Sequence, residues 1–136
     1  MRKFIFILAL PALFFCFSCG EKGRTAGETP EKIFNTATDA MLRGDDALAI
    51  ELYYRILENH SGFKRYREDI YFRLGNMLYK AGRIDEAEKM FSRMTREYPE
   101  YPGIKSVYEK LLYIYVHEYK DDAQAQEVRN IYAGKY

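Results

Sequence analysis

The sequence is poor in the residues that build catalytic and metal sites. It has no tryptophan, two histidines and two cysteines among 136 residues. Both cysteines lie close to the N-terminus, so no disulfide can join distant parts of the chain, and the core must rely on packing. His117 is followed by Glu118 but lacks the second histidine of a helix-borne zinc motif. We therefore expect no enzymatic activity, no metal site and no cofactor.

An excess of charge of one sign is also missing. The chain has 21 basic and 20 acidic residues, a net charge of +1, which argues against a nucleic-acid partner. The basic and aromatic residues at 63–67 are interpreted as a solvated turn with partly buried rings; weak contact with anionic lipid headgroups is the alternative. No glycine-rich phosphate loop follows a predicted strand, so no small-molecule substrate is evident.

Two pairs of adjacent aspartates remain as candidates for acid–base chemistry. Asp45 and Asp46, like Asp121 and Asp122, stand where a helix is predicted to begin. Carboxylates at such positions accept hydrogen bonds from free backbone N–H groups and interact favourably with the helix dipole. We interpret both pairs as helix caps.

The one long hydrophobic run lies at the N-terminus. Arg2 and Lys3 precede residues 4–17, which carry no charge. This pattern is typical of a signal peptide, and the run is too short for a good membrane-spanning helix. Ser18 and Cys19 then resemble the signal of a bacterial lipoprotein, in which a small residue precedes the cysteine that is lipidated. Cys16 and Phe17 depart from the usual leucine and small residue at those positions.

This resemblance implies that residues 1–18 are removed and that Cys19 carries fatty acyl groups such as palmitate. The protein would then be exported and lipid-anchored to the cell membrane or outer membrane, facing the periplasm or the exterior. Ordinary secretion with cleavage near Ser18 and an uncleaved N-terminal anchor are the alternatives. A redox or metal pair formed by Cys16 and Cys19 is disfavoured, because both lie at the end of the leader. Residues 19–30 are small, polar and aperiodic, which predicts a flexible tether.

Helical spacing of apolar residues begins at residue 31 and is clearest between residues 68 and 101. Two predicted helices, a glycine turn and a closing proline are marked there by Tyr71, Leu74, Gly75, Leu78, Gly82, Ala87, Phe91, Met94 and Pro99. This pattern resembles one tetratricopeptide repeat, with Tyr71 in place of the usual tryptophan. In that family two helices cross closely at Gly75 and Ala87, where a larger side chain would cost about 1–3 kcal/mol.

Two further copies flank this one. The earlier copy has the helix-facing residues Ile33, Ala37, Ala40, Ala49, Tyr53 and Ile56 and a turn at Gly44. Gly44 and Gly82 are 38 residues apart, four more than the usual period of about 34. We expect residues 63–66 to hold the surplus as an extra helical turn. The later copy lacks a glycine in its turn, near Lys120, and its second helix has no certain register; it serves partly as a cap.

The resemblance implies an all-α fold for residues 31–136, a short alpha-alpha solenoid of about three tetratricopeptide-like hairpins. An unrelated helical bundle is the alternative. The order of the helices separates the two, because hairpins in a solenoid touch only their neighbours, whereas a bundle brings distant helices together.

In this family the first helices of the hairpins line a concave groove that binds partners. By this resemblance the groove residues are Phe34, Asn35, Thr38, Met41, Phe72, Arg73, Asn76, Tyr79, Lys80, Glu109, Tyr113 and His117. The alternative is that aromatic residues such as Phe72 and Tyr79 only pack against neighbouring helices. Some family members hold a C-terminal carboxylate with a lysine and an asparagine. Asn76 matches that asparagine, but Phe72 stands where the lysine would be, so we do not expect this clamp.

The sequence thus predicts a membrane-anchored module that binds a protein or peptide partner in the bacterial cell envelope. The exported repeat lipoproteins that the chain resembles include some that assist outer-membrane assembly and some that coordinate envelope complexes, so we expect a partner in such machinery. A structural lipoprotein that associates with itself and has no peptide-binding groove is the second hypothesis.

Overall fold

The structure, a computed structural model, describes residues 28–135. This part of the chain is all helical and contains no strand. None of its helices combines the length and the apolar character that crossing a membrane requires. The predicted signal peptide, lipidation at Cys19 and most of the predicted tether lie outside the described residues and stay predictions.

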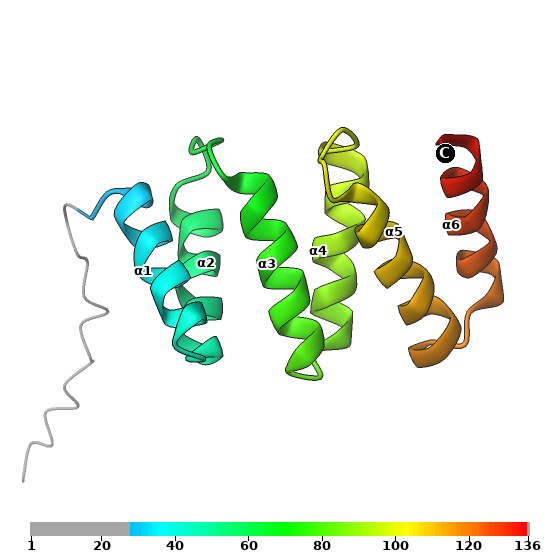
Figure 1. The fold of residues 1–136 in the computed structure, drawn as a ribbon, viewed down its shortest axis with the longest axis horizontal. Coiled ribbons are helices and arrows are strands. Elements are labelled where there is room, and N and C mark those ends of the chain that lie inside the picture. Colours follow the sequence, from blue (N-terminus) through cyan, green and yellow to red (C-terminus); the bar gives the residue numbers. More distant parts are fainter. Residues whose placement is uncertain (1–27, 136) are drawn as a thin grey trace, which may run out of the picture.

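Three helical hairpins follow one another in the described part of the chain. The helices are α1 (Pro30–Leu42), α2 (Asp46–Asn59), α3 (Arg67–Lys80), α4 (Ile84–Glu97), α5 (Ile104–Tyr113) and α6 (Asp122–Lys135), and a short π-helix, η1 (Ile114–Glu118), continues α5. Figure 1 shows the hairpins side by side along the long axis, with extensive packing only between helices that are neighbours in the chain. This order confirms the solenoid and excludes a bundle.

Helix caps fix where the hairpins start. The Thr29 side chain accepts a hydrogen bond from the Lys32 N–H, and Pro30 begins α1, one residue before the predicted boundary. The Asp45 carboxylate accepts from the Leu48 N–H at 3.2 Å, and the Asp121 carboxylate accepts from the Gln124 N–H at 3.0 Å. The interpretation as caps is therefore confirmed for Asp45 and Asp121, whereas Asp46 and Asp122 lie in the first turns of α2 and α6.

The turns inside the hairpins need a left-handed residue. Gly44 and Gly82 supply it with φ of 79° and 75°, at no steric cost because glycine has no Cβ. In the third hairpin Lys120 adopts this conformation, with φ of 53°. The turn without glycine therefore forms, but with a backbone conformation that is unfavourable for a lysine.

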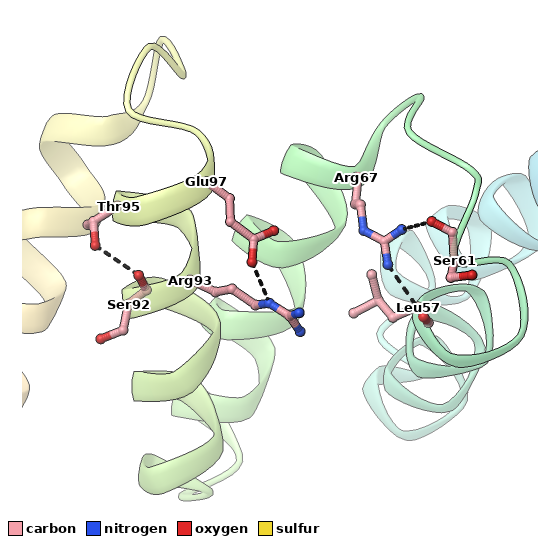
Figure 2. A network of polar contacts seen from close by, with 7 residues as sticks. All are labelled: Leu57, Ser61, Arg67, Ser92, Arg93, Thr95 and Glu97. Carbon is pink, nitrogen blue, oxygen red and sulfur yellow. Dashed lines mark hydrogen bonds and ion pairs between the residues drawn. The ribbon is translucent and has the colours of Figure 1, made fainter.

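The prediction of an extra helical turn at residues 63–66 is wrong. Residues 60–66 form a non-helical loop between α2 and α3, because Tyr66 has a left-handed φ of 60° that no right-handed helix can contain. Arg67 fastens this loop: its guanidinium donates to the Ser61 carbonyl at 2.7 Å and to the Leu57 carbonyl at 3.4 Å (Figure 2). The four surplus residues thus form a loop tied to the end of α2.

Close helix crossings hold each hairpin together. Gly75 is buried in α3 against the ring of Phe91 in α4, and Ala87 has no exposed surface. The predicted close approach of two helices is confirmed at Gly75, and Ala87 is buried in the same core. In the last hairpin α6 buries only Ala125 and Val128, as expected of a helix that caps one end of the stack.

Candidate functional site

Arg73 joins the first helices of the first two hairpins. Its guanidinium carbon lies 5.9 Å from the centre of the Phe34 ring, and Nη1 lies 3.8 Å from the Met41 sulfur. Phe34 is only 8% exposed, because its ring stacks on Tyr66 at 4.6 Å. Arg73 and Met41 therefore form the accessible part of this junction, and the buried Phe34 ring packs beneath the Arg73 guanidinium.

A pocket lies between the first helices of the second and third hairpins. It has a volume of about 360 Å³ and is lined by Tyr79 from α3 and by Ser106, Glu109, Lys110 and Tyr113 from α5. The rings of Tyr79 and Tyr113 meet edge to face, with their centres 6.2 Å apart. Tyr113 is half exposed, at 50%, so the pocket offers aromatic surface to a partner.

Neighbouring groups hold the pocket's tyrosines in place. The Tyr79 hydroxyl donates to Glu118 at 3.2 Å, and burial followed by this hydrogen bond raises the pKa of Tyr79 above its ordinary value. The His117 ring lies 4.4 Å from the Tyr113 ring. The structure thus brings Tyr79, Tyr113, His117 and Glu109 together, as the groove prediction requires.

The remaining predicted groove residues of α3 have contacts of their own. The Phe72 ring lies 5.6 Å from the ring of Tyr101. The Asn76 amide donates to the Phe72 carbonyl at 2.7 Å, and its side-chain oxygen accepts no hydrogen bond from residues 28–135. Lys80 reaches away from α5 and pairs with Asp46 at the start of α2, at 2.9 Å. Asn76 therefore keeps a hydrogen-bond acceptor for a partner.

On α1 two polar residues complete the predicted set. Asn35 is exposed. Thr38 is partly buried, and its hydroxyl lies 3.2 Å from the hydroxyl of the buried Tyr53. Thr38 therefore belongs to the contact between α1 and α2 as much as to the surface.

Sequence reasoning missed two residues that line the pocket, Ser106 and Lys110. Together with Tyr113 they follow the spacing i, i+4, i+7 on α5, so they lie on one face of the helix. This spacing could have identified them once Tyr113 was chosen. The weak definition of the third repeat obscured it.

Metal-ligand residues are dispersed in the described part of the chain. Between residues 28 and 135 no three His, Cys, Asp or Glu side chains gather closely enough to hold a metal ion. Two nearby carboxylates are instead engaged with tyrosines: Glu118 accepts from Tyr79, and, beyond Phe72, Asp69 accepts from the Tyr101 hydroxyl at 3.3 Å.

Comparison with known proteins identifies the fold family. A family model described as a tetratricopeptide repeat matches residues 40–111, more than half of the chain. The chain belongs to the tetratricopeptide-repeat family. The match runs from the end of α1 into α5, so it includes the second hairpin and the helices on either side of it. Tetratricopeptide repeats are protein–protein interaction modules and are generally non-enzymatic scaffolds.

One relative of this tetratricopeptide-repeat protein is an uncharacterised protein from Aquifex aeolicus (strain VF5). The two are 41% identical over 56 residues, which is 41% of this chain and 7% of the relative. The chain therefore spans a small part of that protein's length. The likeness carries no information about a specific partner.

Proposed function

We propose that the protein is a lipid-anchored adaptor of the bacterial cell envelope, which holds a partner protein on the face formed by α1, α3 and α5. The observation that carries this proposal is the pocket between α3 and α5, where Tyr79 and Tyr113 offer aromatic surface beside polar groups. Tyrosine and arginine are enriched among the residues that dominate binding energy at interfaces. Here Tyr113 and Arg73 supply both within one surface.

The anchor rests on the sequence. The charged start, the apolar run and Ser18-Cys19 support lipidation at Cys19, which is eleven residues before Pro30, the first residue of α1. A flexible segment of this length spans about 17–20 Å. A lipidated Cys19 would therefore keep the repeats within a short distance of the membrane surface, where they meet envelope proteins.

Site-specific photo-crosslinking in the native bacterial cell tests the binding face. A crosslinking amino acid replaces Glu109, which is exposed and lines the pocket, and in a matched strain it replaces Lys89, which is exposed on α4. We expect a discrete crosslinked protein from position 109 that is absent from position 89 and is lost when Tyr113→Ser is added. Equal products from both positions would contradict the proposal. A product made of two copies of this chain would favour the self-associating structural role.

Cell fractionation tests the anchor separately. Wild type and Cys19→Ala are compared for membrane association and for incorporation of labelled fatty acid. We expect label and membrane association in wild type alone. A wild type that is soluble and unlabelled would remove the anchor and leave the binding face untouched.

A further inference from the structure

Arg73 is a partly buried cation without an acidic partner. Among residues 28–135 it forms no ion pair, and its one polar contact is the Met41 sulfur. By contrast Lys80, in the same helix, pairs with Asp46. A guanidinium presents several N–H donors in a fixed planar arrangement that matches a carboxylate. Arg73 therefore keeps this capacity for a group from outside the chain.

Two carboxylates near Arg73 and the pocket are hydrogen-bonded to tyrosines and form no ion pair with nearby cations of the described residues. Glu118 accepts the hydroxyl of Tyr79, and Asp69 accepts that of Tyr101. Lys110 and Glu109 both line the pocket, and neither makes an ion pair within residues 28–135. Arg73 and Lys110 thus remain as cations without an ion pair in the described part of the chain, beside an aromatic pocket. Their unused N–H donors favour an acidic segment that also carries a large apolar side chain.

The distance between Arg73 and the pocket sets how far apart the acidic and the apolar side chains of the bound segment must be. Arg73 precedes Tyr79 by six residues in α3, which is about 9 Å along the helix axis. The guanidinium lies on the α1 side of α3 and the pocket on the α5 side, so they are also offset sideways by about one helix spacing of 8–10 Å. The combined separation is about 13 Å, the length of about four residues of extended peptide.

We propose that the occupant of the groove is an extended segment of the partner in which an acidic side chain pairs with Arg73 and a large aromatic or aliphatic side chain, about four residues away, fills the pocket beside Tyr79 and Tyr113. This inference rests on the proposed function and specifies its ligand. The acidic group belongs to a side chain inside the segment, so a free C-terminus is not required.

Binding of short synthetic peptides to the purified full-length protein tests the rule. Each of two parent peptides carries one Glu and one Phe with three residues between them in a Gly/Ser background, and both ends are blocked. Glu precedes Phe in one parent, and Phe precedes Glu in the other. Derivatives replace Glu by Gln, replace Phe by Ser, or place Glu and Phe next to each other. Fluorescence anisotropy gives the Kd of each peptide for wild type, Arg73→Gln, Arg73→Glu and the matched control Arg96→Gln, since Arg96 is exposed on α4.

We expect one parent to bind wild type about tenfold more tightly than each of its three derivatives. The Arg73→Gln protein should lose the preference for the Glu peptide over the Gln peptide and keep the preference for the Phe peptide over the Ser peptide. The Arg73→Glu protein should bind the Glu peptide less tightly than the Gln peptide. The Arg96→Gln protein should behave as wild type. Far-ultraviolet circular dichroism checks that each variant is folded. The pattern is one that a general loss of structure would not produce.

Equal binding of the Glu and Gln peptides in both orders would overturn the inference, as would parents that bind no better than their derivatives. The outcome for the proposed function is distinguishable. If the peptides do not bind as expected but crosslinking from position 109 still depends on Tyr113, the partner-binding face is supported and its ligand has a different chemistry. Failure of both experiments would contradict the proposal that this face binds a partner.

Discussion

The ring of Phe91 lies so close to Gly75 that a Cβ at residue 75 would come within 2.6 Å of Phe91 Cε1. Phe91 has no exposed surface, so its ring can move only by disturbing the core. We expect Gly75→Ala to lower the free energy of unfolding by about 1–3 kcal/mol. Urea denaturation measures this change.

Gly134→Ala is the matched control for this substitution. Gly134 lies in α6, and no atom lies within 4 Å of its added Cβ. Alanine is the better helix former, so the control should be neutral or more stable by up to about 1 kcal/mol. Equal destabilisation by both substitutions would contradict the close packing of α3 on α4.

Removing the hydroxyl of Tyr71 should stabilise the protein or leave it unchanged. Tyr71 is fully buried, and its hydroxyl has no hydrogen-bond partner in the described part of the chain. An unsatisfied buried polar group costs about 1–3 kcal/mol, and Tyr71→Phe removes it while keeping the ring. Thermal unfolding followed by circular dichroism measures the effect.

Tyr115→Phe provides the opposite case. The Tyr115 hydroxyl donates to Glu88 at 2.7 Å, so its removal should lower the free energy of unfolding by about 1 kcal/mol. If Tyr71→Phe were the more damaging of the two, the hydroxyl of Tyr71 would have a partner in solution.

Replacing Lys120 with glycine should stabilise the protein. The left-handed φ of 53° at Lys120 is strained for a residue with a Cβ, and Gly44 and Gly82 occupy the equivalent turns. We expect Lys120→Gly to raise the free energy of unfolding by up to about 1 kcal/mol and Gly82→Ala to lower it by a similar amount. Nothing lies within 4 Å of a Cβ at Gly82, so the second change reports backbone conformation alone. Urea titration of both variants checks the pair.

Stability should fall at alkaline pH. Burial, followed by hydrogen bonds to Glu86 and Glu88, raises the pKa of Tyr54 and Tyr115 to about 12 from the ordinary value of 10.0. The folded protein therefore keeps protons that the unfolded chain loses above a pH of about 10. This stabilisation is fully present below that pH and is lost as the pH rises through about 12.

Urea midpoints measured across this alkaline range test the prediction. A double variant, Tyr54→Phe with Tyr115→Phe, should start from a lower stability and lose less of it as the pH rises. Other tyrosines with raised pKa, including Tyr119, keep part of the effect in the double variant. An unchanged pH dependence in the double variant would show that these two phenols are not responsible.

The hairpins were predictable from the sequence because their packing residues recur at fixed spacing. Gly75 and Ala87 marked the crossing of α3 and α4, and Gly44 and Gly82 marked two turns, since each of these positions tolerates few residue types. The aspartate caps followed from the same local reasoning. These features depend on contacts within one or two helices.

The loop at residues 60–66 and the third turn could not be predicted in this way. Tyr66 adopts a left-handed backbone while its ring stacks on Phe34, more than thirty residues earlier, and no local pattern announces such a tertiary contact. Lys120 likewise takes a conformation that its residue type disfavours. For the candidate site, the family resemblance pointed to the faces of α3 and α5 that meet at the pocket. The partners of individual side chains, such as Asp46 for Lys80, required the structure.

Because extensive packing occurs only between helices that are neighbours in the chain, no contact clamps the two ends of the stack together. Opening can therefore begin at an end without breaking the middle. Helix α6 buries only Ala125 and Val128, so it should detach at lower cost than the crossing of α3 and α4. Since α5 packs against α6 on one side and lines the pocket on the other, fraying of the last helix would loosen the binding face. A bound partner that braces α5 against α3 would then slow hydrogen exchange in α6, a helix it never touches.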